Sequence, residues 1–223
     1  MTKLNNISTV IFDIGGTLIH INPKVFEKYI GKYDPAYSIS GDFRKIDIEA
    51  KRKITTDNKN FVEDYFGEIL DKISEDPEIK KKVLSDLSPL AYSSSKEIWN
   101  DLDPFAVDTL NYLNNKYKLG IISNNVGDAE AMLQTAGIYK FFDKIVDSKI
   151  YGTSKPDPRI FLHTAEELKA SPKTCVYVGD VFDWDAVGAL NSGMTPILVY
   201  APKSAFRFSV ITIENLSGLK NLL

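Results

Sequence analysis

The stretch that decides the fold is Thr9-Val10-Ile11-Phe12-Asp13-Ile14-Gly15-Gly16-Thr17-Leu18. It is preceded by Ile7, and the apolar, β-branched run over residues 7–12 predicts a strand buried on both faces. The run ends at Asp13, and two glycines follow, so the backbone can turn sharply and approach a ligand closely. Open α/β sheets bind ligands beyond the carboxyl ends of their strands. Asp13 is therefore a candidate functional residue, and an aspartate that only begins a turn is the alternative.

Composition limits the classes of protein to consider. The 223 residues are 43% hydrophobic, enough for a sizeable core, and the net charge of −3 argues against nucleic-acid or membrane-surface partners. The single cysteine, Cys175, precedes an apolar run and reads as a buried structural thiol, in keeping with a reducing compartment. No apolar run reaches about 18 residues, and residues 1–8 lack signal-peptide features. We expect a cytoplasmic protein with no nucleic-acid or membrane partner.

Strands and helices alternate through the second part of the chain. Strands are predicted at residues 117–123, 145–146, 176–178, 197–199 and 210–213, and helices at 105–116, 128–136, 158–168 and 185–191. This alternation predicts an α/β fold, a Rossmann-like parallel sheet with helices on both faces.

Residues 21–100 interrupt that pattern. They are rich in Lys, Asp, Glu, Tyr and Ser, without convincing strand alternation, and helical spacing occurs at 23–30, 60–70 and 77–84. We therefore expect a Rossmann-like core formed by residues 1–20 and 101–223, with residues 21–100 inserted as a helical domain.

Polar groups follow several of the predicted strands. Asp13 and Asp180 are carboxylates at two strand ends, Ser123 is a hydroxyl at a third, and Lys155 lies in a loop near the same edge. Two facing carboxylates repel unless a cation lies between them, and hard oxygen ligands suit Mg²⁺. A lysine and a hydroxyl beside such an ion fit phosphoryl transfer. Simple turn and helix-capping roles are the alternative for each residue taken alone.

Four segments together resemble the motifs of the haloacid dehalogenase superfamily. The Asp13 stretch resembles the first motif, D-x-D-x-T, and Ser123 in Ile-Ile-Ser-Asn-Asn resembles the second. Lys155 in Lys-Pro-Asp-Pro resembles the third, and Gly-Asp180 with Asp185 beyond it resembles the fourth. The resemblance runs from about residue 7 to 200 and is weakest over 22–101, where it implies a helical cap that selects substrates.

The resemblance also implies a role for each matching residue. Asp13 would attack phosphorus and form an aspartyl-phosphate on a small phosphorylated substrate, helped by Lys155 and Thr17. The phosphate would be bound by Ser123, Asn124 and Lys155, and Mg²⁺ would be held by Asp13, Gly15, Asp180 and Asp185.

Gly15 departs from the family pattern, since it replaces the second aspartate of the first motif. A glycine keeps the backbone carbonyl that would bind Mg²⁺ but lacks the side chain that protonates the leaving group. General acid–base catalysis contributes about 10² to 10⁴-fold, so we expect an impaired phosphatase that favours activated leaving groups. His20 is a candidate replacement for the missing group.

Other reactions remain open at this point. Phosphonate hydrolases of the superfamily keep the metal and use a cap lysine, and 2-haloacid dehalogenases attack carbon without a metal. The dehalogenases have a serine where this chain has Asp180, whose charge would repel a halocarboxylate. A non-catalytic phosphate-binding protein is the alternative from another class. Neither the substrate nor the oligomeric state is indicated by the sequence.

Overall fold

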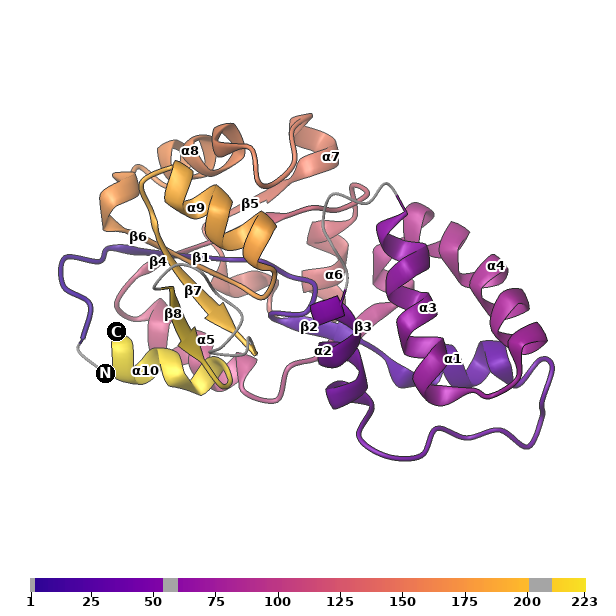
Figure 1. The fold of residues 1–223 in the computed structure, drawn as a ribbon. Coiled ribbons are helices and arrows are strands. Elements are labelled where there is room, and N and C mark those ends of the chain that lie inside the picture. The colour runs from indigo at the N-terminus through magenta and orange to yellow at the C-terminus, as the bar shows by residue number, and fades with distance from the viewer. Residues whose placement is uncertain (1–2, 54–59, 201–209) are drawn as a thin grey trace. The chain divides into compact units, whose positions relative to one another are not determined.

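The computed structural model describes residues 3–53, 60–200 and 210–223. The chain forms two compact units (Figure 1): a core unit made of Met1–His20 and Asp101–Leu223, and a helical unit made of Ile21–Asn100. The chain passes between them in β2 (Ile19–Ile21) and β3 (Trp99–Leu102), which pair as a two-stranded sheet. The sequence pattern did not predict these two short strands.

The core unit is built on a six-stranded sheet in the order β5-β4-β1-β6-β7-β8, and every neighbouring pair is parallel. The strands are β1 (Thr9–Phe12), β4 (Lys118–Ser123), β5 (Lys144–Asp147), β6 (Cys175–Gly179), β7 (Thr195–Val199) and β8 (Ile211–Ile213). All four residues of β1 are buried, because β1 lies between β4 and β6. The strand ends after β1, β4 and β6 are therefore neighbours at one edge of the sheet.

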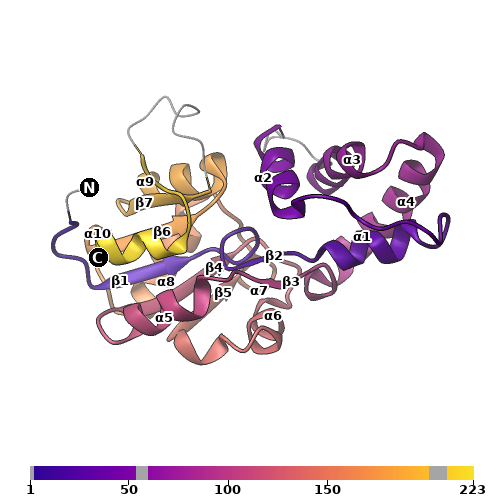
Figure 2. The ribbon, with the colours of Figure 1, turned by 90° about the horizontal axis from the view of Figure 1, so that it is seen from below.

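Helices cover both faces of this sheet. Helices α8 (Pro158–Glu167) and α9 (Val187–Asn191) lie over one face, and α5 (Ala106–Asn114) and α10 (Leu219–Leu222) lie over the other (Figures 1 and 2). The described part of this unit also contains α6 (Ala129–Thr135) and α7 (Ser148–Tyr151). Pro158 begins α8 and the Asp157 side chain caps it by accepting from Arg159 N. The predicted Rossmann-like α/β fold is confirmed.

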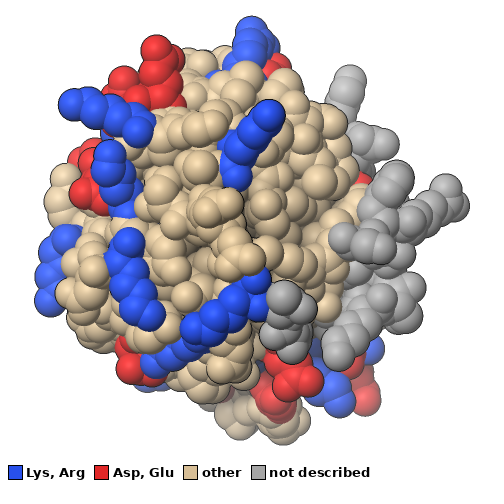
Figure 3. Space-filling view, turned by 90° about the vertical axis from the view of Figure 1, so that its left-hand side faces the viewer, with Lys and Arg blue, Asp and Glu red and all other residues tan. Residues whose placement is uncertain are grey.

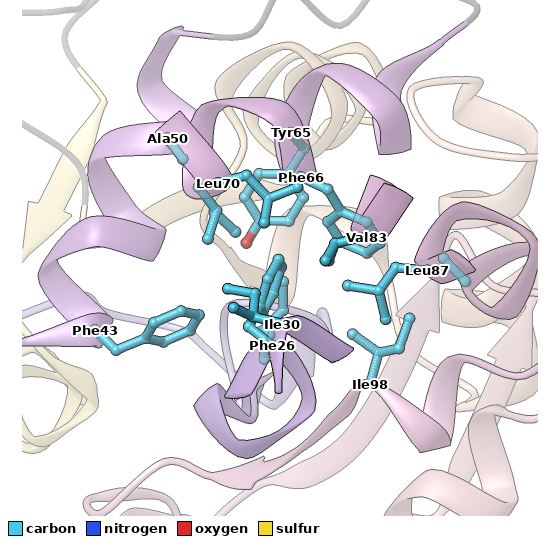
Figure 4. Packing of buried hydrophobic residues seen from close by; sticks show 13 residues of the cluster. Phe26, Ile30, Phe43, Ala50, Tyr65, Phe66, Leu70, Val83, Leu87 and Ile98 are labelled. Carbon is cyan, nitrogen blue, oxygen red and sulfur yellow. The ribbon is translucent and has the colours of Figure 1, made fainter. Parts of the chain in front are cut away.

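The helical unit contains α1 (Pro23–Ile30), α2 (Phe43–Lys53), α3 (Phe61–Ile73) and α4 (Pro77–Ser93). Figure 4 shows Phe26 and Ile30 of α1 pointing toward side chains of α3 and α4 in one apolar cluster. Phe26 meets Phe66 edge-on at 5.6 Å between ring centroids. This cluster is internal to the unit, so the unit has a hydrophobic core of its own.

Two helices of this unit differ from the prediction. Helix α2 was not predicted, because charged residues dominate its sequence and hide its apolar face. Helix α4 extends to Ser93, well past the predicted end at residue 84, and includes Pro89. Asp76 caps its first turn by accepting from Glu78 N and Ile79 N.

Figure 3 shows the distribution of charged side chains on one face of the molecule. On the face in Figure 3, basic side chains (blue) and acidic side chains (red) are interspersed around a broad area of other residues. The described residues of that face show no continuous basic stripe of the kind that binds nucleic acid. Within the described ranges, no helix combines the length and the apolarity needed to cross a membrane.

Candidate active site

Asp13 directly follows β1 and so lies at the carboxyl end of this central strand. Asp13 N donates to Val178 O at 2.9 Å, which continues the sheet ladder to this residue. The chain then turns, with Gly16 at φ +89°, a conformation that side chains disfavour. Thr17 is buried, and its hydroxyl donates to Asp180 Oδ1 at 3.1 Å. Thr17 thus joins the loop after β1 to the loop after β6.

Lys155 lies at the centre of the candidate site and is only 3% exposed. Its ammonium nitrogen is 2.8 Å from Asp13 Oδ1 and 2.7 Å from Asp185 Oδ1. It also donates to the Tyr177 hydroxyl at 3.0 Å. An ammonium group has three N–H donors, so these three acceptors match its full capacity.

Burial and neighbouring charges have opposite effects on the pKa values of Asp13 and Lys155. Burial raises the pKa of Asp13 to about 7, although the Lys155 ammonium opposes the shift. Burial alone would lower the pKa of Lys155, but the carboxylates of Asp13 and Asp185 outweigh it and raise the pKa above its ordinary value. Lys155 is therefore charged at neutral pH and favours the ionised form of Asp13.

Asp185 is held from two directions. Its Oδ2 accepts from Asp180 N at 3.0 Å and from Val181 N at 2.8 Å, while its Oδ1 accepts from Lys155. It lies in a π-helical turn, Phe182–Ala186, that precedes α9; the sequence predicted an α-helix directly from residue 185. With both oxygens occupied, Asp185 is better suited to orient Lys155 and the β6 loop than to ligate an ion directly.

Asp13 and Asp180, with Asp185 beside them, form an acidic cluster that could hold a metal ion. One oxygen from each of Asp13, Asp180 and Asp185 can be chosen so that the three lie within 4.8 Å of one another. Such a small set of hard oxygen donors fits Mg²⁺, which keeps several of its waters. Gly15 lies in the adjoining turn and forms an isolated bridge with Ile19.

Ser123 and Asn124, the predicted phosphate ligands at the end of β4, have different surroundings. Ser123 ends β4 and is 4% exposed. The Asn124 side chain instead holds the Lys155 backbone: its amide nitrogen donates to Lys155 O at 3.0 Å, and its oxygen accepts from Lys155 N at 2.8 Å. Asn124 thus fixes the loop that carries Lys155, a role that the sequence pattern did not indicate.

His20 occupies a separate buried cluster. Its Nε2 is 2.9 Å from Asp103 Oδ2, its ring meets Tyr200 edge-on at 5.5 Å, and only 2% of the residue is exposed. A group that protonates a leaving group must face the substrate. This geometry does not support His20 as the replacement for the side chain missing at Gly15.

Sequence reasoning missed Tyr177. Its hydroxyl contacts Lys155, Asp185 and the backbone of β4, but a tyrosine within an apolar strand reads as core. The thiol of Cys175, by contrast, is buried as predicted; it donates to Ser171 O at 3.3 Å, and burial raises its pKa to about 11.

The chain is similar in sequence to known proteins over most of its length. Residues 7–193 match the family described as haloacid dehalogenase-like hydrolase. Over 154 residues the chain is 32% identical to the glyceraldehyde 3-phosphate phosphatase of Methanothermobacter thermautotrophicus. The matched region covers 65% of this chain and 68% of the relative. Over 137 residues it is 33% identical to the enzyme of the same name from Methanopyrus kandleri, covering 60% of this chain and 58% of that relative.

Solved structures show the same fold. The HAD-hydrolase YfnB of Bacillus subtilis, solved with magnesium bound, matches this chain with a TM-score of 0.63 at 20% sequence identity. The match covers 97% of this chain and 98% of YfnB. At this identity the likeness establishes the architecture and leaves the chemistry to the residues of the site.

Proposed function

The chain belongs to the haloacid dehalogenase-like hydrolase family, and on that premise we propose that it is a Mg²⁺-dependent phosphatase acting on a small phosphorylated substrate through Asp13. One observation carries the proposal: the Lys155 ammonium lies 2.8 Å from Asp13 at the carboxyl edge of the sheet, beside two further carboxylates. A buried carboxylate paired with a fixed cation, next to hard oxygen ligands, suits transfer of a phosphoryl group.

The donor set supports a metal ion at this edge. Asp13 and Asp180 would hold Mg²⁺ with the Gly15 carbonyl, while Asp185 would orient the group around it. When bound, the ion would reduce the repulsion between the carboxylates and the negative charge of a phosphate.

The proposed reaction has two steps. In the first, an Asp13 carboxylate oxygen bonds to phosphorus while the bond from phosphorus to the leaving oxygen breaks. In the second, a water oxygen bonds to phosphorus and the bond to Asp13 breaks, releasing inorganic phosphate. Lys155 stabilises the ionised nucleophile, and Ser123, at the neighbouring strand end, would hydrogen-bond a phosphate oxygen.

Gly15 restricts the substrates that such a site can use efficiently. The departing oxygen leaves without a proton from residue 15, so aryl and acyl phosphates should react faster than alkyl phosphates. The two relatives named above make glyceraldehyde 3-phosphate the alkyl phosphate to test first. The helical unit would act as the cap that selects among substrates.

The test compares phosphate release by the wild type, Gly15→Asp and Asp13→Asn, with Mg²⁺ and with chelator. An aryl phosphate and glyceraldehyde 3-phosphate serve as the two substrates. We expect Mg²⁺-dependent turnover of the aryl phosphate by the wild type, none by Asp13→Asn, and a gain on the alkyl phosphate in Gly15→Asp. Turnover that persists in Asp13→Asn would refute the assignment of the nucleophile.

A phosphate-binding protein without turnover is the second candidate, and Gly15 is the feature that favours it. In that case only Gly15→Asp releases phosphate, although the wild type binds phosphate in the presence of Mg²⁺. Halide release from a 2-haloacid without a metal would favour a dehalogenase instead, against the charge of Asp180. Formation of a lysine Schiff base with a phosphonate substrate would indicate the phosphonate hydrolase reaction.

A further inference from the structure

We propose that Tyr177 is a positioning residue of the candidate site, and that its phenol oxygen holds the Lys155 ammonium against Asp13. The kinetic part of this inference rests on the proposed phosphatase function. The structural part concerns only the Tyr177–Lys155 contact and can be tested without turnover. Tyr177 acts through Lys155 and needs no contact with the substrate.

The position of Tyr177 in the sheet explains how it reaches the site. Tyr177 on β6 is the register partner of Ile11 on β1, so both side chains lie on the face covered by α8. The ring packs edge-on against Phe161 of α8 at 4.9 Å, which fixes its direction. From there the hydroxyl reaches Ile122 O on β4 at 3.2 Å. One side chain thus spans three strands directly before the residues of the candidate site.

The contact with Lys155 completes the coordination of the ammonium group. Two of its three N–H donors face the charged oxygens of Asp13 and Asp185, and the third faces the Tyr177 oxygen at 3.0 Å. A buried N–H donor without an acceptor is unfavourable, and removal of the phenol oxygen leaves the ammonium held by Asp13 and Asp185 alone. Its orientation toward Asp13 would then be less well defined.

The phenol itself is suited to this role because it keeps its proton. A phenol has an ordinary pKa of about 10, so the hydroxyl is neutral at neutral pH. The neutral hydroxyl can accept from Lys155 while donating its single hydrogen to Ile122 O or to Asp185 Oδ1. An ionised phenolate would add another negative charge to a cluster that already holds three carboxylates.

The kinetic experiment uses Tyr177→Phe, which keeps the ring against Phe161 and removes one oxygen. We expect kcat for aryl phosphate to fall about tenfold, in keeping with one hydrogen bond to a charged group, while KM changes less than about twofold. Tyr117→Phe is the matched control: its hydroxyl also donates to one carbonyl, Leu223 O at 3.0 Å, but it precedes β4 at the opposite end of the strand. Equal losses of kcat in both variants would overturn the proposal, because a general structural effect would then explain them.

The second experiment records the ¹H–¹⁵N NMR signal of the Lys155 ammonium, assigned by its absence in Lys155→Arg. A buried ammonium with three acceptors exchanges its hydrogens slowly, so we expect a protected signal in the wild type and in Tyr117→Phe. We expect Tyr177→Phe to shift that signal and accelerate the exchange. An unchanged signal in Tyr177→Phe would overturn the proposal, even if no variant released phosphate. A changed signal together with an inactive wild type would support the positioning contact and refute the phosphatase function.

Discussion

Gly179 is the position where one added methyl group should test the geometry of the site most severely. A Cβ on Gly179 would lie 2.3 Å from Asp185 Cγ and 2.4 Å from its Oδ2. Nonbonded carbon atoms pack at about 3.5 to 4.0 Å, so the Asp185 carboxylate would have to retreat by roughly 1.2 Å. Gly179 is not in the left-handed region, so this steric conflict, rather than backbone strain, decides the effect of Gly179→Ala.

The displacement has a calculable consequence. Moving the carboxylate stretches at least one of two bonds beyond hydrogen-bonding range: the bond from Val181 N, now 2.8 Å, or the bond from Lys155 Nζ, now 2.7 Å. Overpacking costs about 1 to 3 kcal/mol. One lost hydrogen bond to a charged group costs about 1.5 to 3 kcal/mol more. We expect Gly179→Ala to lower the free energy of unfolding by about 4 kcal/mol, which corresponds to a fall in Tm of about 8 to 16 °C in a chain of this size.

The assay is scanning calorimetry together with phosphate release at a temperature where the variant is folded. Gly67→Ala is the control, because Gly67 is inside α3 and its added Cβ meets no described atom within 4 Å beyond its chain neighbours and the backbone of its own helix. That variant should gain about 0.5 to 1 kcal/mol. If Gly179→Ala melts with the wild type and retains its activity, Asp185 does not pack on Gly179 and the proposed support of Lys155 is refuted.

Three further outcomes are expected. Burial raises the pKa of Asp103, but the hydrogen bonds with His20 and Tyr200 together lower it by more, so the folded pKa lies below the ordinary value. The stabilising contribution of Asp103 is present above its unfolded pKa and is lost as pH falls through its folded pKa. Urea melts should therefore show the free energy of unfolding of the wild type falling below about pH 4, and a smaller fall in Asp103→Asn. Phe66→Ala in the helical unit should cost about 3 to 5 kcal/mol in urea unfolding, since Phe66 is fully buried; a loss below about 1 kcal/mol would contradict the packing seen there. Chelation should abolish phosphate release and added Mg²⁺ should restore it; a full rate in chelator would exclude the proposed metal site.

Most of the secondary structure of the core unit was predictable because most of its elements carry a local signal; the short helices α7 and α10 were not predicted. The strands β1, β4 and β6 are short apolar runs ending in Asp, Ser or Gly-Asp, and Pro158 after Asp157 begins α8. In the helical unit, and in the two strands in which the chain passes into and out of it, the signals are weaker. Charged residues conceal the apolar positions of α2, and β2 and β3 are too short to show alternation.

The candidate site joins residues that are distant in the sequence, so only some of them could be identified from sequence patterns. Asp13, Lys155, Asp180 and Asp185 are identifiable because each lies at a strand end or loop in a known order, and the structure brings the four together. The partners that orient them leave no signal of this kind. The Asn124 amide holds the Lys155 backbone across a separation of 31 residues, and the Tyr177 hydroxyl crosses from β6 to β4.

By itself the sequence determined the α/β core, its parallel sheet and the polar groups at the strand ends, because hydrophobic periodicity and turn residues act over short distances. Tertiary structure alone decided which groups satisfy the three donors of Lys155, that Asp185 is held by the β6 loop, and that His20 pairs with Asp103. These choices depend on distances between strand ends and on the burial of opposite charges. Both quantities exist only once the sheet has formed.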